Sequence, residues 1–431
     1  MNRVLKYFIF FLVLVFSGNY SLKADGYEVK ICISHIRDTQ LMLSHRMGNR
    51  FFVDDTIRIK PGECGVFKDI NPLPQGMYQI VLPSKKYIEF FMDADQQFSI
   101  HTSADHLIDS ISFDGSETNT IFQNWQKHLS HKQIDTIFWK ETINRLGNGV
   151  AGKFVKGLYP VQIPVNLTQN EKYLYYRHHF FDNIDFADQR LLRTPLIRNK
   201  LNQYCAKVAL PDPDSVINDL KKIIKQSEQN PDVYQYTVQF LFNYYAEPKI
   251  MGMDAVYVYL AEHYYLKGKT PWITSENLQT IIQRVNELKP LLIGQPAPEL
   301  PGLINNRGES VRLDQFKGQL LILYFWEPDC GFCKEATPKL RSYYDELKQD
   351  GVEVLAVNTR EDTLSWDSFI RDHHLNWINV YSPKKVIPLL ENYQAWSTPT
   401  IYILNKQQKI IAKNLTVDQI VPFIQHYRKN H

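Results

Sequence analysis

The chain has 431 residues, of which 44% are apolar and 22% are charged, so it is too long for one hydrophobic core and too apolar for a disordered protein. Its 49 Lys and Arg residues nearly balance 46 Asp and Glu, which leaves a formal net charge of +3. This balance disfavours a nucleic-acid binder, because such proteins usually carry a concentrated basic surface.

Residues 1–24 have the pattern of a secretory signal peptide. Arg3 and Lys6 precede an unbroken apolar run at residues 7–16, and Ala24 offers a small residue before a cleavage point. The run is shorter than the roughly 20 residues that a helix needs to cross a bilayer, although an uncleaved anchor remains the alternative. Because no cysteine lies there for lipid attachment, we expect a soluble periplasmic protein that is not a lipoprotein.

Residues 25–115 are predicted to form an antiparallel β-sandwich. Short segments with alternating apolar residues are separated by turn residues, at positions 28–33, 40–45, 56–60, 78–82 and 87–92. Cys32 and Cys64 fall in this region. They would either form a disulfide or remain two separate buried thiols, because a free cysteine packs as a small apolar residue.

Residues 116–290 are predicted to form a separate helical region. Apolar residues recur there at steps of three and four, which predicts helices at 118–128, 214–228, 233–246, 254–267 and 276–289. Asp214 and Ser275 are the expected N-caps. The histidine pairs at 178–179 and 373–374 are adjacent in sequence, so their side chains point to different sides of a regular element and no metal site is expected.

Residues 291–431 are predicted to form an α/β domain with a mixed sheet. The Pro- and Gly-rich segment at 294–302 marks the boundary before it. Strands are expected at 319–326, 352–357 and 377–381, helices at 332–348, 363–373 and 417–428, and a strand hairpin at 400–404 and 409–413.

Cys330 and Cys333 are separated by two residues at the junction between the first of these strands and the helix after it. The unpaired N–H groups and the positive end of the helix dipole would favour a thiolate at Cys330, and the thiolate is the nucleophile in disulfide exchange. One turn further in, Cys333 would be more buried and less acidic, yet close enough to resolve a mixed disulfide.

The segment FWEPDCGFCKEATPKL (325–340) resembles the active-site region of the TlpA/ResA-like thiol–disulfide oxidoreductases of the thioredoxin superfamily. Residues 293–318 resemble the opening segment of that family with its initial hairpin, and Pro338 matches the proline of its active-site helix. This resemblance spans residues 293–431 and implies a thioredoxin fold for the C-terminal domain. More weakly, the preceding regions resemble accessory domains fused to such reductases in exported proteins of Gram-negative bacteria.

The resemblance also implies roles for individual residues. Pro399 matches the cis-proline of the family, which would place Thr398 beside the cysteines and let its backbone position an extended substrate. Thioredoxins carry a buried aspartate where this chain has Tyr324, and many relatives carry a glutamate where it has Ala336. Glu327 and Glu335 are therefore the candidate proton acceptors for Cys333.

We expect an exported reductase that acts on protein disulfides, uses no cofactor and, by the resemblance, receives electrons from a membrane electron-donor protein. A zinc site would need two further ligands, and no second cysteine pair exists. A peroxidase of related fold would place a lone cysteine in a Pro-x-x-x-Thr/Ser-x-x-Cys context, which this chain lacks. The alternative is a polypeptide- or glycan-binding protein whose redox domain is secondary, and the oligomeric state stays open.

Overall fold

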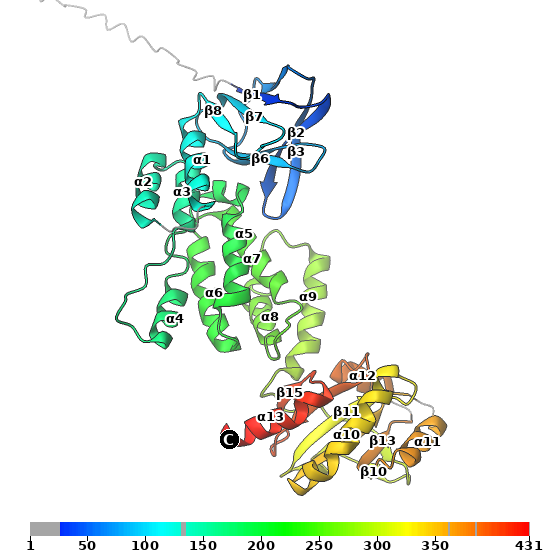
Figure 1. The fold of residues 1–431 in the computed structure, drawn as a ribbon. Helices are drawn as coiled ribbons and strands as arrows, with labels where there is room; N and C mark the ends of the chain where they lie inside the picture. Colours follow the sequence, from blue (N-terminus) through cyan, green and yellow to red (C-terminus); the bar gives the residue numbers. More distant parts are fainter. Residues whose placement is uncertain (1–25, 131–134, 361–362, 384–385, 431) are drawn as a thin grey trace, which may run out of the picture. The chain divides into compact units, whose positions relative to one another are not determined.

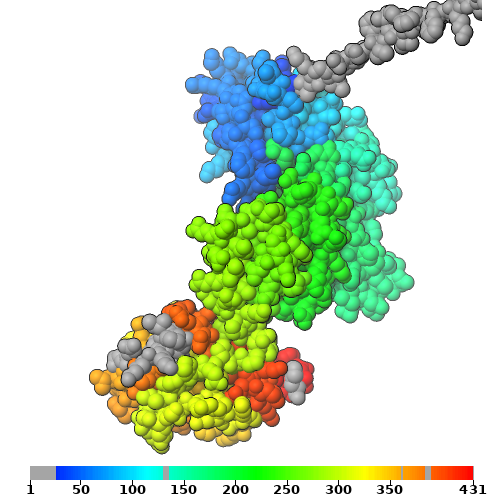
Figure 2. Space-filling model, turned by 180° about the vertical axis from the view of Figure 1, so that it is seen from behind, coloured from blue at the N-terminus to red at the C-terminus, as the bar shows by residue number. Residues whose placement is uncertain are grey.

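The computed structural model describes residues 26–130, 135–360, 363–383 and 386–430, so the predicted signal peptide lies outside the described residues. Figure 1 shows the chain as a ribbon coloured along the sequence. The chain divides into two compact units. One holds residues up to Pro160 together with Arg190–Ile197, and the other holds Val161–Gln189 together with Arg198–His431. Figure 2 shows these residues in space-filling form, coloured along the sequence. Within the described ranges, no helix is both long and apolar enough to cross a membrane.

The N-terminal strands form two four-stranded sheets among the described residues, ordered β4-β1-β7-β8 and β3-β2-β5-β6. The strands are β1 (Tyr27–Ser34), β2 (Thr39–Met47), β3 (Arg50–Ile59), β4 (Cys64–Asp69), β5 (Gly76–Val81), β6 (Tyr87–Met92), β7 (Gln97–Ser103) and β8 (Ser112–Asp114). Buried side chains from both sheets, including Ile31 of β1 and Leu43 of β2, share one core cluster. The sandwich arrangement stays a prediction.

One pairing in the first sheet corrects the all-antiparallel expectation, because β1 and β7 run parallel. A parallel pair requires a long crossover connection. Here the connection passes through the second sheet, and this route returns β7 in the same direction as β1.

Cys32 and Cys64 form a disulfide. The two residues lie directly opposite each other in the antiparallel pairing of β1 with β4. The sequence leaves two alternatives open, and the prediction of two separate buried thiols is therefore wrong. Register decided between them, because only the pairing of these strands brings the two cysteines face to face.

Helices dominate residues 117–291, as the sequence predicts. The α-helices are α1 (Glu117–Ser130), α2 (Thr136–Leu146), α3 (Val150–Leu158), α4 (Gln169–His178), α5 (Leu196–Gln203), α6 (Pro213–Ser227), α7 (Pro231–Tyr244), α8 (Asp254–Leu260) and α9 (Ser275–Leu288). Short 3-10 turns are η1 (Gln189–Arg193) and η4 (Lys289–Leu291), and π-helical turns are η2 (Tyr204–Val208) and η3 (Ala261–Tyr265).

Both predicted N-caps are displaced. Asp212, rather than Asp214, caps α6 by accepting a hydrogen bond from Ser215 N at 2.8 Å. The reason is Pro213, whose fixed φ suits the first helical position and makes the residue before it the cap. Thr274, rather than Ser275, caps α9 and accepts from Asn277 N at 3.3 Å.

The described residues of the C-terminal domain form a seven-stranded sheet, ordered β10-β9-β13-β12-β11-β14-β15. Its elements are β9 (Leu303–Asn305), β10 (Ser310–Val311), η5 (Leu313–Phe316), β11 (Leu320–Trp326), α10 (Gly331–Gln349), β12 (Val352–Asn358), α11 (Leu364–Asp372), β13 (Ile378–Tyr381), α12 (Val386–Tyr393), β14 (Thr400–Leu404), β15 (Ile410–Lys413) and α13 (Val417–Asn430). Strands β11, β12 and β13 are parallel, whereas β14 runs antiparallel to β11. The predicted α/β thioredoxin-like architecture is thereby confirmed.

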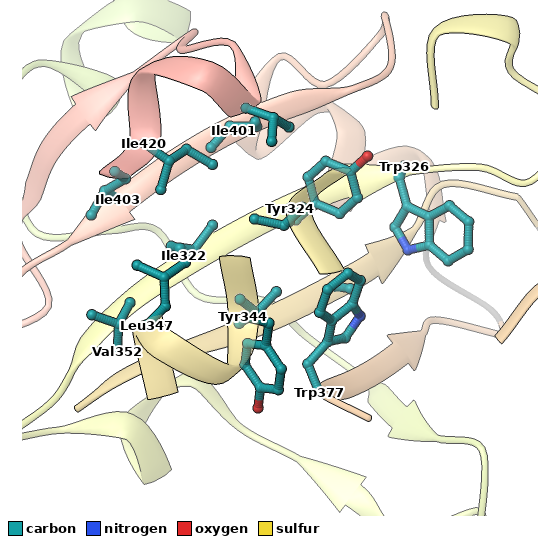
Figure 3. Close-up of a cluster of buried hydrophobic side chains, with 14 of the residues drawn as sticks. Ile322, Tyr324, Trp326, Tyr344, Leu347, Val352, Trp377, Ile401, Ile403 and Ile420 are labelled. Carbon is teal, nitrogen blue, oxygen red and sulfur yellow. The ribbon is translucent and has the colours of Figure 1, made fainter. Parts of the chain in front are cut away.

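Strand β11 is buried along its whole length because helices cover both faces of the sheet. Ile322, Tyr324 and Trp326 point to the face where α10, α11 and α13 pack (Figure 3). Leu323 and Phe325 point to the opposite face, against η5 and α12. This burial fixes the strand, and with it the position of the residues that follow.

The predicted boundary segment is held against the sheet edge. Gly294 N donates to Ile410 O at 2.8 Å, Ile410 N donates to Gln295 O at 2.9 Å, and Ala297 N donates to Gln408 O at 2.9 Å. Residues 294–297 therefore cover the outer edge of β15, which would otherwise present unpaired backbone groups.

A buried ion pair joins β15 to α8. Lys413 is 7% exposed, pairs with Asp254 and donates to Leu291 O at 2.7 Å. A charge buried to this extent needs both its counterion and its hydrogen bonds. The thioredoxin-like domain and the end of the helical region are therefore coupled through Lys413.

Replacing Asp254 should leave the ammonium group of Lys413 buried without its counterion. We expect Asp254→Ala to lower the free energy of unfolding by about 3–5 kcal/mol, as is typical when one partner of a buried ion pair is removed. Urea titration followed by tryptophan fluorescence measures the change. The control Asp314→Ala removes half of the exposed Arg312–Asp314 pair and should leave the transition almost unchanged. Equal effects of the two substitutions would contradict the assignment.

Candidate active site

Cys330 occupies the N-cap position of α10. Its backbone is extended, with φ −71° and ψ 123°, and its sulfur accepts a hydrogen bond from Cys333 N at 3.2 Å. A serine or aspartate oxygen usually performs this task. Cys330 is half-buried, whereas Cys333, within the first turn of α10, is 0% exposed. Both are free thiols, with the first open to solvent and the second enclosed, as the sequence predicts.

The peptide bond between Thr398 and Pro399 is cis, as the resemblance implies. This loop reaches the cysteines because β14 pairs with β11, with Thr400 opposite Phe325 near the end of the buried strand. The Cys330 thiol donates to Thr398 O at 3.2 Å. The structure thus brings together four of the predicted site residues: Cys330, Cys333, Thr398 and Pro399.

The pKa of the Cys330 thiol lies below its ordinary value. Partial burial alone would raise it, but hydrogen bonds from the side chains of Cys333 and Thr398 and from the N–H groups of Cys333 and Phe332 outweigh that effect. Because these donors favour the charged form, Cys330 holds a larger thiolate fraction at neutral pH than an ordinary cysteine.

The opposite holds for Cys333. Burial, reinforced by the hydrogen bond to Cys330, raises the pKa of its thiol to about 12, although the Glu327 N–H and the Thr398 side chain act in the other direction. The reduced pair therefore keeps its proton on Cys333 and its negative charge on Cys330. This division suits a nucleophile with a protected second thiol.

Tyr324 of β11 lies in the same core cluster as the two cysteines. Its hydroxyl is buried and lies 2.8 Å from Thr337 Oγ1 on α10. Burial raises the pKa of Tyr324 above its ordinary value, and the nearby Cys333 and Cys330 add to the shift. The hydroxyl consequently stays neutral, and it cannot replace the ionised aspartate expected in thioredoxins as a proton acceptor.

The two candidate carboxylates are placed differently. The Glu327 carboxylate pairs with the Arg360 guanidinium, whose Nη2 lies 3.4 Å from Oε1, and it accepts from Thr359 Oγ1 at 3.5 Å. The Glu327 backbone acts on Cys333 by lowering the pKa of its thiol. Glu335 is exposed on α10. The structure therefore gives Glu327 a backbone role at the site, and a proton-accepting role for either carboxylate stays a prediction.

Sequence reasoning did not identify Arg360, Thr337 or Trp396. Arg360 could have been found, because it follows β12, the parallel neighbour of β11, and the ends of parallel strands meet at one edge of a sheet. Trp396 is 63% exposed two residues before Thr398, and Phe332 is 77% exposed two residues after Cys330. Both segments that contribute to the thiol site therefore also present an exposed aromatic ring.

Alkylation should distinguish the two thiols. The thiolate fraction rises as pH rises through the pKa, so a lowered pKa at Cys330 predicts rapid labelling by iodoacetamide at pH 7. Cys333 should remain unlabelled until the protein is denatured, because its pKa is about 12. Cys205 is an internal control, since burial raises its pKa to about 12 as well. Mass spectrometry locates the label, and equal labelling of Cys330 and Cys333 would refute this division.

Arg360 should act as a positioning residue for resolution. By holding the Glu327 carboxylate, it fixes the residue whose backbone lowers the pKa of the Cys333 thiol. With Ellman's reagent, attack by Cys330 releases the first thionitrobenzoate and attack by Cys333 releases the second. We expect Arg360→Ala to slow the second release about three- to tenfold, roughly the worth of one hydrogen bond, and to spare the first. Arg360→Lys should retain part of the rate.

The control for this experiment is Arg312→Ala, which breaks the exposed pair with Asp314. It should change neither phase. If Arg360→Ala slowed both releases equally, its effect would be a general loss of structure and the positioning role would be wrong.

Comparison with known proteins finds relatives of two parts of this chain. Residues 293–413 match the model described as the AhpC/TSA family, and residues 125–289 match one described as a domain of unknown function, DUF5106. The chain is 28% identical to the thiol-disulfide oxidoreductase ResA of Bacillus subtilis over 118 residues, which are 27% of this chain and 64% of ResA. It is 30% identical to ResA of Halalkalibacterium halodurans over 104 residues, which are 24% of this chain and 58% of that protein.

The chain thus spans less than two thirds of each of these two relatives. Among solved structures, a thioredoxin-like protein from Bacteroides caccae aligns with a TM-score of 0.50 and 21% identity. The alignment covers 62% of this chain and 97% of that one. At this level of identity the likeness concerns the fold.

Proposed function

We propose that this protein, whose residues 293–413 form a thioredoxin-like domain of the AhpC/TSA family, is an exported thiol–disulfide oxidoreductase that reduces disulfides in protein substrates. One observation carries the proposal: Cys330 is the N-cap of α10, and its lowered pKa makes it a nucleophile beside a protected Cys333. Cys330 and Cys333 are its catalytic residues.

The reaction requires two exchanges. The Cys330 thiolate attacks one sulfur of the substrate disulfide, so a Cys330–substrate bond forms and the other substrate sulfur leaves as a thiolate. Cys333 then gives up its proton and attacks the Cys330 sulfur, which releases the second substrate thiolate. The substrate gains two electrons, and the cysteine pair becomes a disulfide.

The surroundings of Cys330 suit an extended polypeptide. Thr398 and Pro399 are the substrate-positioning residues, because backbone groups of this loop can pair with a strand laid beside Cys330. The exposed rings of Phe332 and Trp396 would contact apolar side chains of that strand. A partly unfolded protein offers both an accessible disulfide and such side chains.

Export has two supports. Residues 1–24 have the composition of a signal peptide. The Cys32–Cys64 disulfide is of a kind that forms in oxidising compartments outside the cytoplasm. In an oxidising periplasm the Cys330–Cys333 pair needs a source of electrons, and the family resemblance assigns this task to a membrane electron-donor protein. Re-reduction would allow repeated turnover.

Reduction of insulin by the full-length chain tests the activity. With dithiothreitol as the electron source, wild-type protein should accelerate insulin precipitation, Cys330→Ser should be inactive, and Cys333→Ser should accumulate a mixed disulfide because resolution is lost. Cys205→Ser removes a buried thiol outside the site and should keep full activity. Equal rates with wild-type and Cys330→Ser protein would refute the proposal. Equilibration with glutathione would fix the direction, since a reductase requires a potential below that of its compartment.

A further inference from the structure

We propose that the Cys32–Cys64 disulfide is a second thiol–disulfide exchange site, which accepts electrons from the reduced Cys330–Cys333 dithiol of another copy of this chain. This inference rests on the proposed function of that dithiol. It concerns the N-terminal sheet, which the proposed activity does not use.

The disulfide is on the outer face of its sheet. Along β1 and β4, burial alternates, so Ile31 and Phe67 enter the core while Cys32 is only half-buried and Cys64 is exposed. Breaking the S–S bond therefore opens no cavity in the core. The antiparallel hydrogen bonds between β1 and β4 remain to hold the strands together.

An attacking thiolate can reach this bond. Both cysteines line a surface hollow of about 510 Å³, together with Gly62, Glu63 and His101. A disulfide at such a hollow is open to nucleophiles, and accessible disulfides tend to be the labile ones in proteins. Cys64, the more exposed partner, is the sulfur that an incoming thiolate would meet.

Strand β4 also has the form that the candidate active site is built to bind. It is the terminal strand of its sheet, so one of its edges lacks a neighbouring strand among the described residues. Cys64 is its first residue. A loop such as Thr398–Pro399 can pair with an extended edge of this kind while Cys330 faces the sulfur.

A histidine lies on the strand next to the disulfide. His101 is directly opposite Cys32 in the parallel pairing of β1 with β7, and its Nε2 is 3.1 Å from Asp114 Oδ2. His101, Cys32 and Cys64 line the same hollow, so an incoming thiolate meets a polar surface there.

The exchange balances with the groups that the chain contains. Cys330 attacks the Cys64 sulfur, so the Cys330–Cys64 bond forms and Cys32 leaves as a thiolate. Cys333 then attacks the Cys330 sulfur, so the Cys330–Cys333 bond forms and Cys64 leaves. Two electrons pass from the C-terminal dithiol to the N-terminal disulfide, and no other reductant is consumed.

Two full-length variants separate the sites. The donor carries Cys32→Ser and Cys64→Ser and keeps the C-terminal dithiol, whereas the acceptor carries Cys330→Ser and Cys333→Ser and keeps the N-terminal disulfide. After mixing reduced donor with oxidised acceptor, the acceptor should gain two alkylatable thiols at a rate within about tenfold of insulin reduction by the same donor. A donor that also carries Cys333→Ser should trap a Cys330–Cys64 mixed disulfide, and its matched control with Cys330→Ser should trap none.

The outcomes separate the two proposals. If the donor reduces insulin but the acceptor keeps its disulfide, this inference is wrong and the proposed function stands. If the donor reduces neither, both are wrong. A second experiment uses wild-type protein, so its result does not depend on whether the variants fold.

Limited dithiothreitol should expose thiols at Cys32 and Cys64 of wild-type protein while the near-ultraviolet circular dichroism stays native. Thiols that appear only in denaturant would also overturn the inference.

Discussion

The hydrogen bond from Cys333 N to the Cys330 sulfur is the interaction on which the chemistry of this protein depends. It makes Cys330 the N-cap of α10, so one contact both starts the helix and prepares the nucleophile. A helix start leaves unpaired N–H groups, and the sulfur that accepts from them is stabilised as an anion. The capping hydrogen bond therefore also helps to lower the pKa of Cys330, beside the side-chain hydrogen bonds from Cys333 and Thr398.

Strand register brings the rest of the site to this helix end. β11 is paired with β12 on one side and β14 on the other. β12 delivers Arg360 to Glu327, and β14 delivers Thr398 to the two sulfurs. Burial of β11 on both faces excludes a shifted register, because a slip of one residue would move Tyr324 and Trp326 to the other side of the sheet. The hydrophobic core thus sets the geometry of a polar site.

Outside the site, prediction succeeded where local pattern decides and failed where remote segments meet. Helices α6, α7 and α9 follow from apolar spacing, and the strands around Cys330 follow from short apolar runs. Helix α12 was not predicted. The N-cap of α6 lies two residues before the predicted one because Pro213 takes the first helical position, and the N-cap of α9 lies one residue before the predicted one. The sequence marked residues 294–302 as a boundary and gave no partner for them, yet residues 294–297 bond to the β15 edge, and Lys413 pairs with Asp254. Such contacts join residues far apart in the chain, and no local spacing encodes them.

By itself, the sequence determined the cysteine pair and its position between a strand and a helix, because both depend on residues within one or two turns of the chain. The placement of the Thr398–Pro399 loop was implied by the family resemblance. Only the tertiary structure decided that Cys32 and Cys64 are joined, that the Glu327 carboxylate is held by Arg360, and that Tyr324 binds Thr337. The physical reason is that a pKa and a bond between distant side chains depend on burial and register. Both arise only when strands from separate parts of the chain pair and exclude water.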